Sequence, residues 1–183
     1  KIELRKVRDF GGILGVTFEY IKQNFKVLFK ANLFIGAPFI LLAGVFLGVY
    51  QSSILNFQVN QDFAQLGIPF LLSMLFTMLA YLIITTVTYS HLMLYNNSEL
   101  ESFDIEQVWQ KVKSIFWMIL FTGLGYVFIV GFGFILLIIP GIYLSIALSL
   151  IFIVRLEEEI SFFNAVSRSI KIISGNWWFT FGL

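Results

Sequence analysis

Regularly spaced hydroxyl groups are the first feature of this sequence that could do chemistry. They recur at every fourth residue of the apolar segment 66–94, at Ser73, Thr77, Tyr81, Thr85 and Tyr89. Residues four apart lie on nearly the same side of a helix, so this spacing predicts a polar stripe. Within a membrane such groups face other helices or a wet path rather than lipid. We favour satisfied hydrogen bonds, with a path for a neutral or amphiphilic substrate as the alternative.

Charged side chains gather after the last long apolar segment. Glu157, Glu158 and Glu159 stand between Arg155 and Arg168 and can form a polar cluster there. Acid–base catalysis needs such groups to converge on a substrate. A local ion pair at a solvated helix start, worth about 0–1 kcal/mol, is the interpretation we favour.

Cysteine and histidine are scarce enough to exclude several kinds of site. The chain has no Cys and one His, His91. Disulfides, thiolate nucleophiles and thiolate metal sites are therefore excluded. A single His near the end of an apolar segment is more often a hydrogen-bonded interfacial residue than a ligand. The sequence thus predicts no catalytic residue, no metal site and no cofactor.

The composition and the long uncharged runs predict an all-α, polytopic membrane bundle. Hydrophobic residues make up 58% of the chain and charged residues 13%, against about 25% charged in soluble domains. The run from Ser114 to Val154 contains no charge. Since roughly 20 apolar residues cross a bilayer as a helix, this run should cross twice. Pro140-Gly141 is the expected reversal, and Gly131-Phe132-Gly133 is the alternative.

We predict a single membrane domain with four complete spans and the start of a fifth. The spans cover 31–50, 66–94, 115–136 and 140–155, and the fifth begins at 177–183. Pro38 should kink the first span. Amphipathic helices at the lipid–water interface should cover 1–30, 101–113 and 161–174, with a loop at 51–65. Ser161 predicts the N-cap of the last amphipathic helix and Gly175 its end.

The first amphipathic helix and the start of the fifth span should contact lipid headgroups. Lys22, Lys26 and Lys30 stand one turn apart beside an apolar face. Each basic residue near an anionic leaflet contributes about 1 kcal/mol. Trp177 and Trp178 are typical of the membrane–water interface. A soluble helix packed on the protein itself is the alternative for residues 1–30.

Small residues spaced four apart predict close helix contacts. Gly44 and Gly48 in the first span could form a dimer face, but packing within the chain is the interpretation we favour. Gly141, Ser145 and Ser149 predict a tight contact along the fourth span.

The distribution of basic residues predicts the topology. Every Lys and Arg lies before the first span, between the second and third, or after the fourth. The loop at 51–65 has one charge, Asp62. The positive-inside rule then places the N-terminus in the cytoplasm. Segments 10–24 and 162–176 also align without gaps, which predicts a repeated unit of one interfacial helix and one hairpin.

Several motifs carry a resemblance to a known family. They are Pro140-Gly141, then Glu157 to Glu159, then Ala165 with Arg168-Ser169, then Gly175-Asn176-Trp177-Trp178, together with the opening segment Tyr20 to Lys30. This pattern resembles the membrane domain found ahead of some bacterial glycerophosphodiester phosphodiesterases and in related six-span inner-membrane proteins. The resemblance implies six helices. The sequence begins with Lys1 rather than Met and ends at Leu183 inside an apolar run, so we expect both ends to be cut from a longer protein. The resemblance implies no chemistry, because that family's catalytic acids and metal ligands belong to a separate soluble domain.

These observations predict a non-enzymatic protein of the bacterial inner membrane. We expect a structural or accessory module that contacts membrane lipids. Other integral membrane proteins, or a second copy of the chain, are candidate partners, and nucleic acid is not. The alternative is a transporter or lipid-handling protein for a neutral or amphiphilic substrate, since the spans lack the ionisable groups of ion-coupled carriers.

Overall fold

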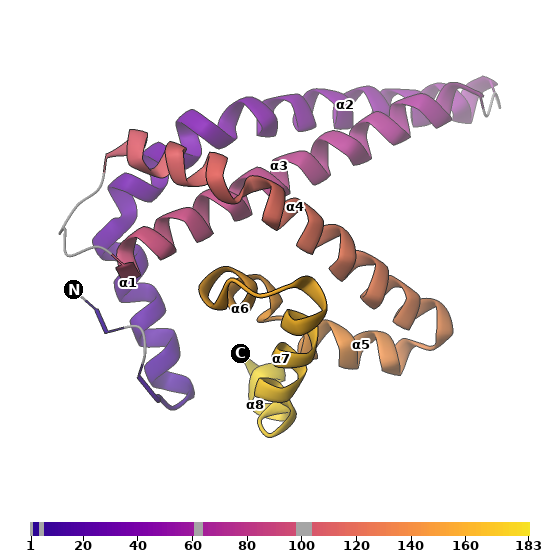
Figure 1. Ribbon diagram of the computed structural model, residues 1–183. Coiled ribbons are helices and arrows are strands. Elements are labelled where there is room, and N and C mark those ends of the chain that lie inside the picture. The colour runs from indigo at the N-terminus through magenta and orange to yellow at the C-terminus, as the bar shows by residue number, and fades with distance from the viewer. Residues whose placement is uncertain (1, 4–5, 61–63, 98–103) are drawn as a thin grey trace. The chain divides into compact units, whose positions relative to one another are not determined.

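The chain is built from helices. The computed structural model describes residues 2–3, 6–60, 64–97 and 104–183, and every regular element in these ranges is helical (Figure 1). Four segments in these ranges are long and apolar enough to cross a membrane, namely Phe10–Asn56, Leu66–Asn96, Ile105–Leu136 and Ile138–Glu158. The predicted all-α class is confirmed.

Contacts divide the chain into two compact units. One unit comprises residues 1–24, 95–101 and 113–183, and the other comprises 25–94 and 102–112. The units interleave along the sequence.

Residues 10–60 form one continuous helical run. Helix α1 (Phe10–Ala31) leads through the π-helical turn η1 (Asn32–Gly36) into α2 (Ala37–Asn60). The N–H of Ala37 donates to the carbonyl of Asn32, one residue further back than in an α-helix. Pro38 follows directly and has no N–H, so regular α-helical pairing cannot continue through it. The departure from regular α-helix thus lies just before Pro38, where the sequence predicts a kink.

Helix α2 is longer than the sequence predicted. Residues 51–60, expected in a loop, continue the helix, because the segment contains neither Gly nor Pro to stop it. Asp62, the one charged residue of the expected loop at 51–65, lies outside the described residues.

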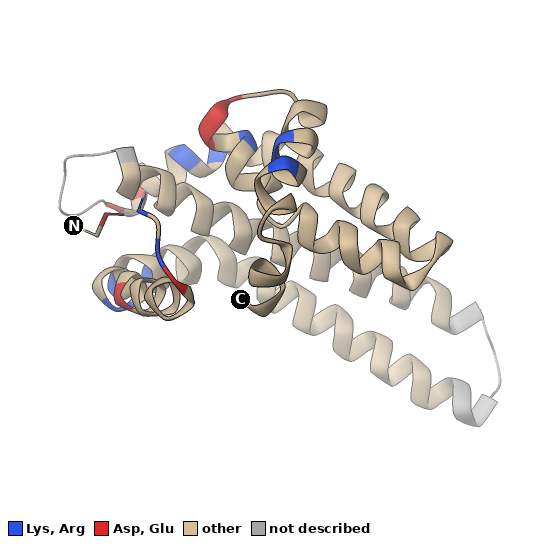
Figure 2. Cartoon of the chain, turned by 90° about the horizontal axis from the view of Figure 1, so that it is seen from below, with Lys and Arg blue, Asp and Glu red and all other residues tan. Residues whose placement is uncertain are grey.

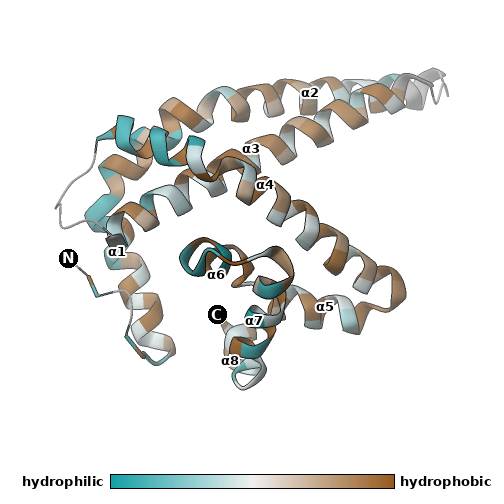
Figure 3. Ribbon diagram, in the orientation of Figure 1, coloured by the Kyte–Doolittle hydropathy of each residue, from teal (hydrophilic) through white to brown (hydrophobic). Residues whose placement is uncertain are grey.

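Helices α2 and α3 (Ala64–Asn97) pack side by side through aromatic rings (Figure 1). The rings of Phe46 and Phe76 stack with centroids 4.3 Å apart and planes 3° apart. Those of Tyr50 and Phe70 lie 5.4 Å apart. Neither helix carries a charged residue (Figure 2), and both are hydrophobic over most of their length (Figure 3).

Helix α4 (Ile105–Leu136) joins two elements that the sequence separated. The amphipathic helix expected at 101–113 and the span expected at 115–136 form one helix, whose start is hydrophilic and whose remainder is apolar (Figure 3). Residues 101–103 lie outside the described ranges. Buried side chains at Val108, Val112, Ile115 and Ile119 recur every third or fourth residue across the change in polarity. A change in polarity does not interrupt helical hydrogen bonding, so the helix continues.

The turn after α4 lies at Leu137, whose backbone is extended with φ −163° and ψ 151°. This turn falls between the expected end of the third span, at residue 136, and Pro140. The alternative turn at Gly131-Phe132-Gly133 does not form, because these residues are helical. Helix α5 (Ile138–Ala147) then returns against α4. A Cβ built on Gly133 would lie 3.2 Å from the Cα of Gly141, and one on Gly141 would collide with the ring of Phe134. The two glycines therefore permit the close return.

The expected fourth span, 140–155, is interrupted. Helix α5 ends at Ala147, and α6 (Ile151–Glu158) begins after a turn at residues 148–150. The hydroxyl of Ser169, in α7 (Phe162–Ser174), donates to the carbonyl of Ala147 at 2.8 Å. The last carbonyls of a helix have no hydrogen-bond partner within that helix. The interruption leaves the Ala147 carbonyl without such a partner, and Ser169 of α7 donates to it.

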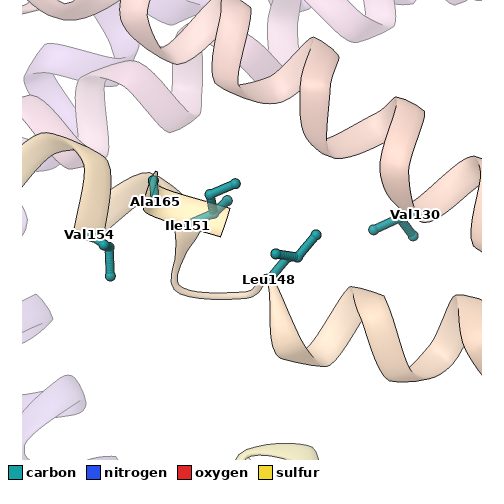
Figure 4. Packing of buried hydrophobic residues seen from close by; sticks show 5 residues of the cluster. All are labelled: Val130, Leu148, Ile151, Val154 and Ala165. Carbon is teal, nitrogen blue, oxygen red and sulfur yellow. The ribbon is translucent and has the colours of Figure 1, made fainter. Parts of the chain in front are cut away.

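The core of the first unit surrounds this interruption. Leu148 and Ile151 are fully buried and cluster with side chains from α4, α6 and α7, namely Val130, Val154 and Ala165 (Figure 4). The apolar turn is thereby held between the neighbouring helices.

Helix α7 begins and ends as the sequence predicted. The hydroxyl of Ser161 accepts the N–H of Asn164 at 3.4 Å, and Gly175 follows the last residue. A short helix, α8 (Trp177–Gly182), comes next. The proposed repeat aligns Phe10 with Phe162, and these residues begin α1 and α7. The two copies then differ, because Gly175 stops α7 where α1 has Gln23.

Candidate functional site

The lysines of α1 lie beside an exposed apolar face. Lys22, Lys26 and Lys30 are all exposed. Large apolar side chains on the adjoining side are exposed as well: Phe18 70%, Ile21 43%, Phe25 57% and Phe29 54%. Tyr20 and Ala31 are buried. At about 100° per residue, the exposed apolar face points away from this buried side, so it is not the face on which α1 packs.

Trp177 is fixed at the start of α8. Its ring stacks on Tyr143 of α5 with centroids 6.0 Å apart, and its Nε1 donates to the Tyr143 carbonyl at 3.5 Å. Trp178 meets Trp177 edge to face at 4.8 Å and is 79% exposed. Of the two predicted interfacial tryptophans, one anchors α8 to the protein and the other projects from it.

A cleft of about 610 Å³ lies beside these rings. Its lining comes from α5, from the end of α7 and the turn after it, and from the start of α8. It consists of Ile139, Ile142, Tyr143 and residues 174–179. Most of this lining is aromatic or aliphatic, and none of it is a carboxylate, an imidazole or a cation. The cleft suits an apolar group such as an acyl chain better than acid–base chemistry.

The predicted hydroxyl stripe of α3 does not stay on one face. Ser73 is buried and donates to the Phe70 carbonyl at 2.8 Å. Thr77 is exposed, Tyr81 is 72% exposed and Thr85 is half-buried. A spacing of four residues drifts by about 40° per step, which amounts to about 120° from Ser73 to Thr85. The drift spreads the stripe around the helix, so its members differ in exposure.

The buried polar groups of α3 stand one residue further along. Thr86 and Ser90 are fully buried and donate to the carbonyls of Leu82 and Thr86, each at 2.7 Å. His91 next to them is also fully buried.

The predicted small-residue contacts are partly made. Gly141 meets the ring of Phe134, as described above. A Cβ built on Gly44 or Gly48 meets no described atom within 4 Å, so the contact expected within the chain is not made. Ser145 bonds back to the Ile142 carbonyl at 2.8 Å. Ser149 lies in the turn after α5, so it does not share a helix face with Gly141 and Ser145.

Arg155 joins three helices in a way that the sequence did not predict. It lies in α6, and its Nη1 donates to Thr122 Oγ1 of α4 at 2.5 Å and to the Met118 carbonyl at 3.4 Å. Its guanidinium carbon lies 5.9 Å from the ring centroid of Phe162, the first residue of α7. Thr122 itself donates to Met118 at 2.6 Å. Two features of the sequence could have indicated this contact. Thr122 is a hydroxyl residue in an otherwise apolar span, and Arg155 is a cation near the end of the following span.

The neighbouring carboxylates of Glu157 and Glu158 interact with residues other than Arg155. Glu158 forms an ion pair with Arg168 of α7, with Oε1 and Nε 3.0 Å apart. The carboxylate of Glu157 accepts from the amide of Asn96 at 3.4 and 3.5 Å. The expected local ion pair therefore forms, and it joins α6 to α7 without involving Arg155.

Comparisons with protein-family models, with curated proteins and with solved structures found no match. Within the described residues, His, Asp and Glu side chains do not gather in groups of three that could hold a metal ion.

Proposed function

We propose that this chain is a non-enzymatic module of the bacterial inner membrane that contacts lipid and supports other membrane proteins. The observation that carries the proposal is the surface of α1. Exposed Phe18 and Phe25 stand beside exposed Lys22 and Lys26, on the side of the helix away from buried Tyr20. An apolar strip flanked by cations fits the boundary between acyl chains and anionic headgroups.

The polar groups of the spans support a structural role. The hydroxyls of Ser73, Thr86 and Ser90 donate to carbonyls of their own helix, which satisfies them without a substrate. The charged groups of Arg155, Glu158 and Arg168 connect α6 to α4 and α7. These groups hold helices together, whereas a catalytic set would converge on one open position.

A lipid-handling function is the second candidate, and the cleft beside Trp177 favours it. A space of about 610 Å³ with an apolar lining is large enough for part of an acyl chain. Such a protein would move the bound lipid, whereas a structural module would keep it in place.

Vesicle assays with the purified full chain separate the two functions. A structural module should not accelerate movement of labelled phosphatidylglycerol between leaflets, nor release trapped neutral solute, beyond protein-free vesicles. It should also copurify with a stoichiometric membrane-protein partner when it is extracted from native membranes in mild detergent. Transport by the purified chain alone would contradict the module and favour the carrier.

The proposed topology, with a cytoplasmic N-terminus, can be tested with single cysteines because the chain has none of its own. Asn60→Cys, at the end of α2, should react with a membrane-impermeant maleimide in intact cells. Gln110→Cys in α4 and Ser174→Cys in α7 should react only after permeabilisation, since they adjoin the lysine-bearing segments. Labelling of Asn60→Cys and Gln110→Cys from the same side would refute this topology.

A further inference from the structure

Arg155 is a cation without a counter-charge in the described chain. No described carboxylate lies within ion-pair distance of its guanidinium, because Glu157 and Glu158 are turned to Asn96 and Arg168. The acceptors that Arg155 does have, Thr122 Oγ1 and the Met118 carbonyl, are neutral. Its Nε is buried and has no hydrogen-bond partner among the described residues.

An anion beside the guanidinium would stabilise this arrangement. A guanidinium keeps its charge under all ordinary conditions, and an uncompensated charge in a membrane helix costs free energy. Arg155 stands within a segment, Ile138–Glu158, that is long and apolar enough to cross a membrane. The neutral acceptors pair with Nη1 and leave the positive charge in place, while Nη2 has no acceptor among the described residues.

The position of Arg155 indicates where the anion comes from. Arg155 lies three positions before Glu158, the end of the candidate span, and arginine side chains near span ends extend toward the headgroup layer. The residue is half-buried, so its outer edge can be reached from outside the protein. A guanidinium matches the geometry of a phosphate group through paired hydrogen bonds.

We propose that Arg155, held by Thr122 and faced by the ring of Phe162, binds the phosphate of an anionic lipid headgroup at the junction of α4, α6 and α7. This inference rests on the proposed function of the chain as a lipid-contacting membrane module. It adds a defined lipid site to the general contact along α1. The lipid supplies the negative charge that Glu157 and Glu158 do not.

The test compares lipids retained by the full chain in mixed micelles of phosphatidylglycerol and phosphatidylcholine, measured by native mass spectrometry. The wild-type chain should retain phosphatidylglycerol preferentially, by about tenfold in the ratio of the first bound lipid. Arg155→Gln should lose this preference. Arg168→Gln is the matched control, because it removes the same charge from α7, where Glu158 already pairs with it. It should keep the preference.

A second variant and a competitor guard against misfolding and against a soluble ligand. Thr122→Val keeps the Arg155 charge but removes an acceptor that orients it, and should lower the preference while helicity by circular dichroism stays unchanged. Inorganic phosphate should not displace the lipid. Displacement by inorganic phosphate, or an undiminished preference in Arg155→Gln, would overturn the proposal. If the wild-type chain retained no lipid at all, the proposed function would fail with it, whereas unselective retention would refute the Arg155 site alone.

Discussion

Replacing Lys22, Lys26 and Lys30 together by glutamine should weaken the attachment of α1 to an anionic membrane by about 3 kcal/mol, on the order of 10²-fold. The three side chains are exposed beside the apolar face that includes Phe18. Each lysine ammonium loses its attraction to lipid phosphates in the variant, while the apolar contact is unchanged. A cysteine at position 18, in both backgrounds, reports the attachment through its rate of reaction with a water-soluble maleimide. The full chain is reconstituted in phosphatidylglycerol-rich vesicles for the measurement.

Two comparisons show whether electrostatic attraction to lipid is the cause. The difference between the variant and the parent should shrink in 1 M salt, where charges are screened within about 3 Å, and in vesicles of phosphatidylcholine alone. Glu19→Gln removes an exposed acid from the same helix and should slow labelling. Equal labelling rates for parent and triple variant in anionic vesicles would mean that α1 packs on protein, the alternative considered from the sequence.

Features that depend on local chemistry could be predicted from the sequence. Ser161 caps α7 because a hydroxyl before a helix accepts an N–H within three residues. The hairpin near Pro140 forms because one uncharged run is too long for a single crossing. Such features require only residues that are close in the chain, so the pattern contains the information.

Boundaries that depend on context could not be predicted. The change from Lys113 to the apolar run was interpreted as the end of one helix and the start of another, yet α4 continues through it. Polarity determines which medium a helix contacts, whereas hydrogen bonding determines where the helix ends. The same reasoning ended the first span too early, at residue 50 rather than at Asn60.

Contacts between residues far apart in the chain could not be predicted from the sequence, for a different reason. Arg155 has three acids within four residues of it, so local spacing favoured an ion pair there. The structure pairs Glu158 with Arg168 and turns Arg155 to Thr122, which lies 33 residues away. The choice depends on which helices pack together, and a pattern of spacing does not contain that information.

The interruption between α5 and α6 is the strongest case, because nothing in Leu148-Ser149-Leu150 is a helix breaker. It leaves the Ala147 carbonyl facing α7, where Ser169 donates to it at 2.8 Å and both residues are buried. Ser169→Ala should therefore destabilise the full chain by about 1–3 kcal/mol, since it leaves a buried carbonyl unsatisfied. Unfolding by denaturant in detergent micelles, followed by tryptophan fluorescence, measures the change.

Ser174→Ala is the matched control on the same helix. The Ser174 hydroxyl is exposed and donates to the carbonyl of Lys171 in its own helix at 3.0 Å, so its loss should change stability by less than about 0.5 kcal/mol. A difference between the two variants would assign the cost to the bond between helices rather than to the loss of a serine from α7. Equal effects would mean that the interrupted span is held by the apolar contacts of Leu148 and Ile151 alone, and that the Ala147 carbonyl finds another donor when Ser169 is removed.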